Sequence, residues 1–444
     1  MGGYLPATES QRQQMLRTIG ISSTDELFEV VPKELLLKNG PEIPDGMSEL
    51  ELSRKIETLA GKNTVFTSVF RGAGAYKHYI PSIVETVVSK ETFLTAYTPY
   101  QPEISQGVLQ SIFEYQTMIC ELTGMDVSNA SLYDGASAAA EAVAMCVDKK
   151  RGKALISAAS HPDTIAVVQT YCWAAGTELE IIPCKDGVTD FKALESKLDA
   201  NVACVYIQQP NYFGMLENCG EISESAHDVG AKLIIGVNPI LAAILKSAGE
   251  SGADIAVGEG QPLGMPLSFG GPYLGFIAST NALMRKLPGR IVGQTTDADG
   301  RRAFVLTLQA REQHIRREKA SSNVCSNQAL CAMTAAVYLA AMGPDGLKSA
   351  AKQCYSKAHY LASELGKIGF PLKYKGEFFH EFVTEIPKEL DVNAILFALE
   401  AKSILGGLPV DAGLLWCATE LSTKVEIDEL VAVVSAVIAD GGGK

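Results

Sequence analysis

The chain has 444 residues, which is too long for one small core and predicts a large domain with a smaller one. Hydrophobic residues make up 47% and charged residues 20%, a composition typical of a soluble globular protein. The net charge of −13 argues against nucleic acid or an anionic membrane as the main partner, because both are bound through basic surfaces.

The ten cysteines contain no CxxC pair and no zinc-type His/Cys spacing, so we expect free thiols in a reducing cytosol and no metal site. Residues 1–9 show no basic region followed by an apolar core, and no export signal is expected. The longest apolar run, residues 329–342, is too short to span a bilayer. These features predict a cytoplasmic protein without a membrane partner.

Residues 1–90 are predicted to form an N-terminal helical arm. Helices are expected at 8–19, where a Thr8-Glu9-Ser10-Gln11 cap precedes apolar positions, and at 22–28 and 47–56. No compact core is visible here, so the arm is expected to wrap a neighbouring subunit or the small domain. The Gly72-Ala73-Gly74 motif has Lys77 in place of a third glycine, which favours a plain turn over a dinucleotide site.

A loop at residues 93–107 is rich in tyrosine, proline and hydrogen-bonding side chains, and a helix is expected after it at 107–123. A stiff polar loop of this kind suits a binding edge, because it loses little entropy on docking. A turn packed on the domain core is the alternative. The residues concerned are Tyr97, Thr98, Tyr100, Gln101 and Glu103.

Residues 91–330 are predicted to form a large α/β domain. Strands are expected at 154–157, 178–183, 202–207 and 232–235, with helices between them at 164–176 and 191–198. This alternation predicts a mainly parallel sheet covered by helices on both faces. Residues 130–141 are predicted to lead into an alanine-rich helix, with Ser137 as a polar residue there. An ordinary N-cap is favoured for this helix start over a phosphate-binding site.

Polar residues follow several of these strands. Ligands of such sheets bind beyond the carboxyl ends of the strands, so these residues are expected to meet in one crevice. A lone histidine is more often a packing residue than a catalyst, but its place at a strand end keeps it a candidate. The set comprises His161, Gln209, Asn211, Asn238 and the loop containing Gln261.

Residues 258–276 have the form of a cofactor loop, with six glycines and three prolines between two predicted strands. Pyridoxal-phosphate enzymes of the aspartate-aminotransferase type carry their Schiff-base lysine in such a place. Here no lysine occurs between Lys246 and Lys286. Counting from the Gly-Gly-Pro turn puts Gln261 at the lysine position, and counting from Asp254 puts Pro262 there.

The acidic partner of a pyridinium nitrogen is missing as well. No aspartate occurs between Asp228 and Asp254, and Asn238 cannot stabilise that charge comparably. The absence of both the lysine and the aspartate favours a non-catalytic pseudo-site.

A basic stretch at 311–319 is expected to form a solvated helical face, with a docking patch of Arg311, Arg316 and Arg317 as the alternative. Residues 331–444 are predicted to form a smaller α+β domain. A helix expected at 330–342 is stopped by Gly343-Pro344, and after it come helices at 347–366, 392–399 and 426–439 and strands at 379–384 and 414–419.

Three motifs together carry a family resemblance: residues 97–103 (YTPYQPE), residues 261–273 (QPLGMPLSFGGPY) and residues 311–319 (REQHIRREK). With them the chain resembles the first subunits of two-subunit glycine dehydrogenases (decarboxylating), the P-proteins of the glycine cleavage system. The likeness covers nearly the whole chain. It implies a type I pyridoxal-phosphate-dependent transferase fold, as in aspartate aminotransferase.

The resemblance also implies partners and a division of labour. A second, homologous subunit would hold pyridoxal phosphate on its own lysine, decarboxylate glycine and pass the aminomethyl group to the lipoyl H-protein. This chain would bind no cofactor covalently and would be inactive alone, in a cytoplasmic heterotetramer with two of each subunit. Its 97–103 loop would border the partner's active site.

Two other functions remain open at this stage. The first is an independent pyridoxal-phosphate enzyme with a relocated lysine, Lys286 or Lys319. The second is a non-enzymatic scaffold that docks the lipoyl carrier through the basic stretch.

Overall fold

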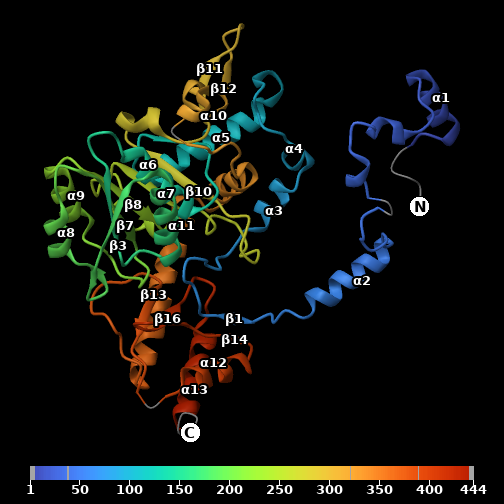
Figure 1. Ribbon diagram of the computed structural model, residues 1–444. Coiled ribbons are helices and arrows are strands. Elements are labelled where there is room, and N and C mark those ends of the chain that lie inside the picture. The colour runs from blue at the N-terminus through green and yellow to red at the C-terminus, as the bar shows by residue number, and fades with distance from the viewer. Residues whose placement is uncertain (1–5, 38–39, 321, 389, 440–444) are drawn as a thin grey trace. The chain divides into compact units, whose positions relative to one another are not determined.

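The computed structural model describes residues 6–37, 40–320, 322–388 and 390–439 (Figure 1). The chain forms two compact units, residues 1–65 and 66–444. The predicted three-part division at residues 90 and 330 stays a prediction. Most of the stretch considered for an export signal, residues 1–5, lies outside the described residues.

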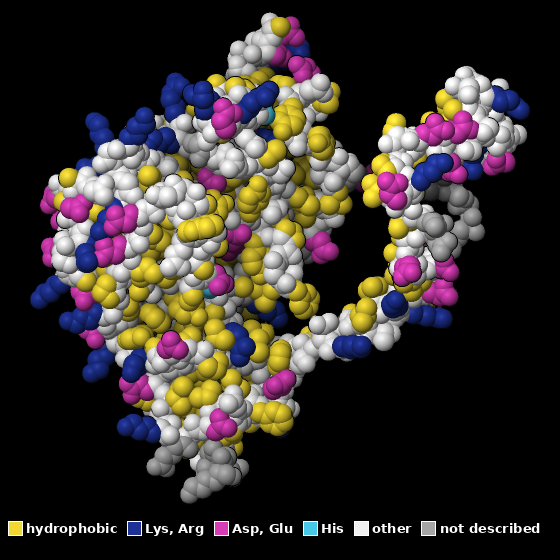
Figure 2. Space-filling view, viewed as in Figure 1, with side chains coloured by type: hydrophobic (Ala, Val, Ile, Leu, Met, Phe, Trp, Pro, Cys, Tyr) yellow, Lys and Arg dark blue, Asp and Glu magenta, His cyan; other side chains and the backbone are white. Residues whose placement is uncertain are grey.

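The first unit consists of short helices with little core. It contains α1 (Glu9–Ile19), the 3₁₀ turns η1 (Thr24–Phe28) and η2 (Lys33–Leu35), and α2 (Glu49–Ala60). The Thr8 cap forms as predicted: Gln11 Oε1 accepts a hydrogen bond from the Thr8 N–H at 2.8 Å, and Thr8 Oγ1 accepts one from the Gln11 N–H. Residues 24–28 form a 3₁₀ rather than an α-helix. Leu16 is the one buried side chain among the unit's described residues, and Figure 2 shows apolar side chains exposed along it.

The second unit is built on a seven-stranded sheet, which confirms the predicted α/β class. Its order is β2-β10-β9-β8-β7-β3-β4. Strands β3, β4, β7, β8 and β9 are parallel, while β10 runs antiparallel to both β9 and β2. Their bounds are β2 (Val127–Ser128), β3 (Lys153–Ser157), β4 (Glu178–Ile182), β7 (Val202–Gln209), β8 (Lys232–Val237), β9 (Ile255–Glu259) and β10 (Gly275–Ser279).

Helices cover both faces of this sheet. One face carries α6 (Gly135–Cys146) and α7 (Pro162–Ala175), and side chains such as Ile156 and Ile234 pack there. The other face carries α5 (Pro102–Thr123), α8 (Phe191–Lys197) and α9 (Cys219–Asp228), where Leu155 and Leu233 pack. Strands buried on both faces are apolar at consecutive positions, which is why they read as continuous hydrophobic runs.

Helix α11 (Ala329–Lys367) connects the core on one face of the sheet with the C-terminal core. The predicted stop appears as a break at Gly343, whose φ of 60° and ψ of 178° are not helical. Before the break, residues such as Tyr338 pack on the sheet, and after it Leu361 and Leu365 pack in the C-terminal core. By length and composition α11 could cross a membrane, but buried core helices pass the same test.

The C-terminal core lies under a three-stranded sheet, β13 (Glu381–Thr384), β16 (Gly413–Cys417) and β15 (Leu408–Val410), with α12 (Val392–Glu400) and α13 (Lys424–Ala439). Trp416 is fully buried at its centre and donates from Nε1 to Thr384 Oγ1 at 3.0 Å. Strand β1 (Ser68–Val69) pairs with β14 (Ile404–Leu405). Residues directly after the first unit therefore belong to this C-terminal part.

The remaining elements connect or project. Figure 1 shows the β11–β12 hairpin at the end of the unit opposite α12 and α13. The other elements are α3 (Ser82–Val88), α4 (Glu91–Leu94), β5 (Cys184–Lys185), β6 (Val188–Thr189), η3 (Leu241–Ala243), η4 (Asn281–Lys286), β11 (Ile291–Thr296), β12 (Arg302–Thr307), η5 (Gln309–Arg311), α10 (Gln313–Arg316) and η6 (Arg317–Lys319). All ten cysteines lie in the described part of the chain and are unpaired.

Gly214 shows how closely the sheet loops meet the C-terminal part. Its φ is +82°, and an added Cβ would lie 1.9 Å from the Glu381 carbonyl oxygen. Gly176, at the end of α7, has a φ of +69° but nothing within 4 Å of an added Cβ. We expect Gly176→Ala to lose about 1 kcal/mol of unfolding free energy from backbone strain, and Gly214→Ala about 1–3 kcal/mol more from overpacking. Chemical denaturation of both variants checks this, and equal losses would contradict it.

Candidate functional site

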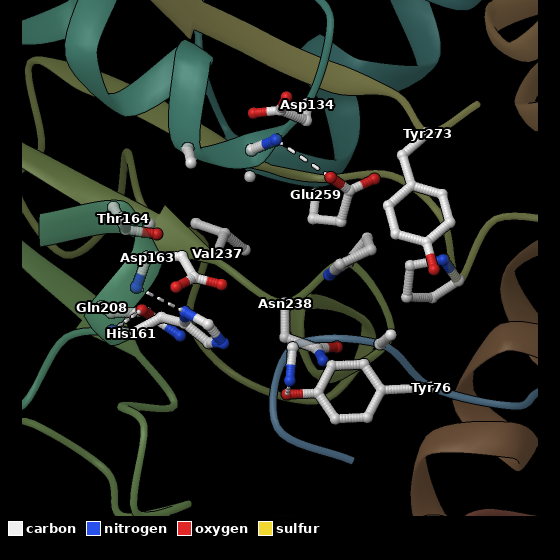
Figure 3. Close-up of a pocket in the computed structure, with 18 of the residues that line it drawn as sticks. Tyr76, Asp134, His161, Asp163, Thr164, Gln208, Val237, Asn238, Glu259 and Tyr273 are labelled. Carbon is white, nitrogen blue, oxygen red and sulfur yellow. Dashed lines mark hydrogen bonds between the residues drawn. The ribbon is translucent and has the colours of Figure 1, made fainter. Parts of the chain in front are cut away.

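A cavity of about 430 Å³ lies at the carboxyl ends of β7, β8 and β9 (Figure 3). The N-terminal ends of α6 and α7 border it, and residues 73–76 contribute a further wall. This is the place where ligands bind in open α/β sheets. None of the described residues that line the cavity is lysine or arginine.

His161 lines this cavity, as predicted, but both of its ring nitrogens are used. Nδ1 accepts a hydrogen bond from the Asp163 N–H at 3.1 Å, which caps α7. Nε2 lies 2.8 Å from the Ala73 carbonyl oxygen, to which it donates. In this arrangement Nδ1 is the acceptor and Nε2 the donor. His161 therefore positions the 73–76 segment and has no free nitrogen for acid–base chemistry.

Asn238 also lines the cavity, at the end of β8. Its Oδ1 accepts hydrogen bonds from the N–H groups of Ile240 at 3.0 Å and Leu241 at 3.1 Å, so the side chain organises the turn that leads into η3. A neutral amide with its oxygen directed at backbone does not stabilise a pyridinium charge as a carboxylate would.

Gln261 is 1% exposed and is bonded into the wall of the cleft. Its Oε1 accepts from the Tyr76 N–H at 3.0 Å, and its Nε2 donates to the carbonyl oxygens of Tyr76 at 2.9 Å and Met265 at 2.8 Å. The adjacent Pro262 faces the cavity instead. Both residues considered for the lysine position thus lie in this wall, and neither can form a Schiff base.

Gln209 and Asn211, which were predicted to lie in the crevice, do not line the cavity, and neither does Ser137. Ser137 is in the first turn of α6 but does not line the cavity; its N–H donates to Asp134 Oδ1 at 2.7 Å. Gln209 points away from the cavity because successive side chains of a strand face opposite sides, and its neighbour Gln208 takes the cleft side. Asn211 is buried and organises the following turn, with Nδ2 bonded to Gly187 O and Glu217 Oε1, both at 2.8 Å.

Glu259, the last residue of β9, is the central polar group that the sequence prediction missed. Its Oε2 accepts from the Gly135 N–H at 3.0 Å, the bond drawn in Figure 3. Its Oε1 accepts from the N–H groups of Gln261 at 2.9 Å and Leu274 at 3.1 Å. Burial raises the pKa of Glu259 to about 7, against the lowering effect of these bonds. The sequence did contain a signal for this site, because Glu259 is a charged residue at the end of an apolar strand and stands between two glycines.

A second buried polar network connects the 73–79 segment to the C-terminal part. Tyr76 donates from its hydroxyl to Glu381 Oε2 at 2.6 Å, and burial raises the pKa of Glu381 to about 7. His78 Nδ1 lies 2.8 Å from Glu420 Oε2, and Cys354 donates to the same oxygen at 3.2 Å. Burial would raise the pKa of Glu420, but the hydrogen bond and charge of His78 outweigh it and the pKa falls to about 2.

His78, Cys354 and Glu420 are the one group of potential metal ligands within 4.8 Å of one another among the described residues. Sequence spacing could not reveal it, because the three come from distant segments. Their mutual hydrogen bonds account for the arrangement without an ion.

The predicted 97–103 edge lies apart from this cavity. Tyr97 is 85% exposed, Gln101 and Glu103 are exposed, and Thr98 is partly buried. Helix α5 begins at Pro102, earlier than predicted, so Glu103 belongs to its first turn. The Tyr100 hydroxyl accepts from Arg290 Nη2 at 3.0 Å.

The basic stretch is not one helix, contrary to the prediction. It is divided into η5, α10 and η6, with Arg317 at a φ of 53°. Arg316 and Arg317 are exposed, whereas Arg311 is partly buried and donates to the Leu287 carbonyl oxygen. The docking role of these arginines stays a prediction.

The sheet order and the cleft at its carboxyl edge define a type I pyridoxal-phosphate-dependent transferase fold. A cysteine desulfurase from Thermococcus onnurineus NA1 shares this fold at a TM-score of 0.62 and 15% identity, covering 89% of this chain and 100% of that chain. At this identity the likeness concerns the fold alone.

The family follows from closer matches. The model of the glycine cleavage system P-protein family matches residues 2–434, and the chain belongs to this family. A relative from Desulfitobacterium hafniense, "Probable glycine dehydrogenase (decarboxylating) subunit 1", is 50% identical over 441 residues, covering 97% of this chain and 98% of the relative. The crystal structure of an inhibitor-bound glycine decarboxylase (P-protein) matches at a TM-score of 0.92 and 41% identity, covering 98% and 100% of the two chains.

The raised pKa of Glu259 predicts how the stability of the fold depends on pH. Between pH 4.5 and about 7 the folded chain keeps a proton that the unfolded chain releases, so folding becomes less favourable as pH rises through this range. The rise from 4.5 to about 7 corresponds to about 3 kcal/mol. We expect Glu259→Gln to lack this part of the loss between pH 5 and pH 8. Urea denaturation at both pH values measures it, and an unchanged pH dependence in the variant would contradict the assignment.

Proposed function

We propose that this chain is a subunit of a glycine-decarboxylating dehydrogenase, an oxidoreductase, that carries no pyridoxal phosphate of its own. It acts with a second, homologous subunit that holds the cofactor. The observation that carries this proposal is Gln261, whose buried side chain makes three hydrogen bonds within the chain in the wall where a Schiff-base lysine would stand. The designation of the Desulfitobacterium relative as subunit 1 supports a second subunit.

The residues of the cleft do not fit pyridoxal phosphate. An aldimine needs a lysine, and none is found among the described lining residues. The pyridinium nitrogen needs an acid, and Asn238 uses its oxygen to accept the N–H groups of Ile240 and Leu241. No step of the reaction is therefore assigned to this cleft, and the decarboxylation of glycine is assigned to the partner subunit.

The contribution of this chain is a surface next to the partner's active site. The exposed side chain of Tyr97 and the Arg290–Tyr100 pair lie on one such surface. Within the described residues, buried atoms of Arg290 (Nε), Arg311 (Nε and Nη2) and Glu312 (Oε1) have no hydrogen-bond partner. Buried charged groups are normally paired, so these atoms support an edge that is completed by another chain.

Further partners follow from the same family membership. The lipoyl H-protein would receive the aminomethyl group, and the exposed Arg316 and Arg317 offer a basic patch for docking it. The apolar side chains exposed on residues 6–65 support an arm that binds another subunit, in a cytoplasmic assembly of two subunits of each kind.

The relocated-lysine alternative has little structural support. Lys286 donates from Nζ to the Met145 carbonyl oxygen at 2.9 Å, and Lys319 is exposed in η6. Neither residue lines the cavity.

The interface role of the 97–103 loop is tested in the reconstituted pair of subunits. We expect Tyr97→Ala and Gln101→Ala each to reduce glycine turnover about tenfold, the effect of removing one good contact, while this chain stays folded. Turnover is measured with the lipoyl carrier, and circular dichroism reports the fold. Trp173→Ala, which removes a similarly exposed aromatic ring (83% against 85%) from α7, is the matched control. Unchanged turnover in both loop variants would remove the loop from the mechanism.

The absence of a cofactor site is tested with the chain alone. Titration with pyridoxal phosphate, followed by borohydride reduction, is expected to leave no aldimine absorption band and no covalent adduct, because no lysine lies in the cleft. Turnover is expected only after the second subunit is added. An adduct on Lys286 or Lys319 together with activity of the isolated chain would favour the independent enzyme. Binding of the lipoyl carrier to this chain without any effect on turnover would favour the scaffold.

A further inference from the structure

At the N-terminal end of α6, two backbone N–H groups donate to side chains of the same chain. Free N–H groups and the helix dipole make such an end a natural place for a phosphate group. Here the Gly135 N–H donates to Glu259 Oε2 at 3.0 Å, and the Ser137 N–H donates to Asp134 Oδ1 at 2.7 Å. Two carboxylates thus bind where an external anion would.

Glu259 is held in this place by three separate segments. Its carboxylate accepts from the first residue of α6, from Gln261 in the following loop and from Leu274 directly before β10. If the side chain moved away, three partly buried backbone N–H groups would lose their partner, at a cost for each. The backbone is also close: a Cβ on Gly135 would lie 2.8 Å from the Glu259 nitrogen.

The charges around the cavity act in the same direction. Asp134, Asp163 and Glu259 line it, and no described lining residue is lysine or arginine. In a partly buried site these charges repel a phosphate dianion far more strongly than they would in water.

We propose that Glu259 takes the position of the phosphate group in this chain's cleft and thereby excludes phosphate monoesters, pyridoxal phosphate among them. The inference rests on the proposed function and deepens it. Loss of a lysine removes only the covalent bond to a cofactor, whereas the phosphate is held non-covalently. A chain without the lysine but with an open helix end could still compete with its partner for the cofactor, and Glu259 removes that competition.

The inference also makes the exclusion depend on pH. Asp134 faces Glu259 from the start of α6, Tyr115 from α5, Cys331 from α11 and Tyr273 from the loop before β10, while Asp163 and His161 lie across the cavity. Burial raises the pKa of Tyr115, Cys331 and Tyr273, so these groups stay neutral at pH 6–8. The pKa of Glu259 is about 7, so its charge changes within this range.

The test uses sulfate, which stays a dianion from pH 6 to pH 8, and isothermal titration calorimetry of the full chain in phosphate-free buffer. At pH 8 we expect Glu259→Gln to bind sulfate at least tenfold more tightly than the unaltered chain, because one opposing charge is gone. Glu217→Gln is the matched control. Glu217 is also a buried carboxyl with a raised pKa, bonded to Asn211 and Thr189, but it does not line the cavity.

A second measurement keeps the test valid if the variant folds poorly. For the unaltered chain, sulfate affinity is expected to rise about tenfold from pH 8 to pH 6 as Glu259 takes up a proton. This dependence is expected to disappear in Glu259→Gln and to persist in Glu217→Gln. Equal sulfate affinity of all three proteins at pH 8, or a flat pH profile for the unaltered chain, would overturn the inference and leave the proposed function intact. An aldimine on the isolated chain would instead overturn the proposed function.

Discussion

The structure of the cleft depends on one buried carboxylate. Glu259 ends strand β9 and accepts hydrogen bonds from N–H groups of α6, of the following loop and of Leu274 directly before β10. These bonds hold the 260–274 loop against the helix and place Gln261 where it can clamp Tyr76. A phosphate anion could satisfy some of the same donors, but the chain supplies its own acceptor. These three N–H groups therefore have their hydrogen-bond acceptor within the chain.

The hydrogen bonds of residues 73–79 connect the sheet to the C-terminal part of the unit. Residues 73–79 are bonded to His161 and Gln261 on one side and to Glu381 and Glu420 on the other. In an enzyme active site, buried carboxyls with raised pKa values often perform proton transfer. Here Glu259 and Glu381 each accept hydrogen bonds from backbone N–H groups, so their buried positions have a structural explanation. Arg311 and Glu312, which have buried polar atoms without a hydrogen-bond partner, do not line the cleft.

Much of the fold could be predicted because its signals are local. The strands beginning near 154, 202 and 232 are continuous apolar runs, and the break at Gly343-Pro344 follows from backbone chemistry alone. The prediction was wrong where long-range contacts determine the local structure or the direction of a side chain. The basic stretch is broken into short turns, and Asn211 and Gln209 turn away from the crevice in which they were expected. The direction of a side chain at a strand end depends on register, which residue types do not reveal.

The sequence by itself determined the family, through three long motifs, and the missing chemistry, because the lack of a lysine between residues 246 and 286 and of an aspartate between 228 and 254 is read directly from the chain. Only the tertiary structure decided which contacts the residues of the cleft make in the absence of that lysine and aspartate. Glu259 meets Gly135 across 124 positions of sequence, and Gln261 meets Tyr76 across 185. Such contacts arise when the sheet and its helices pack, and their hydrogen bonds are specified by three-dimensional geometry rather than by local pattern.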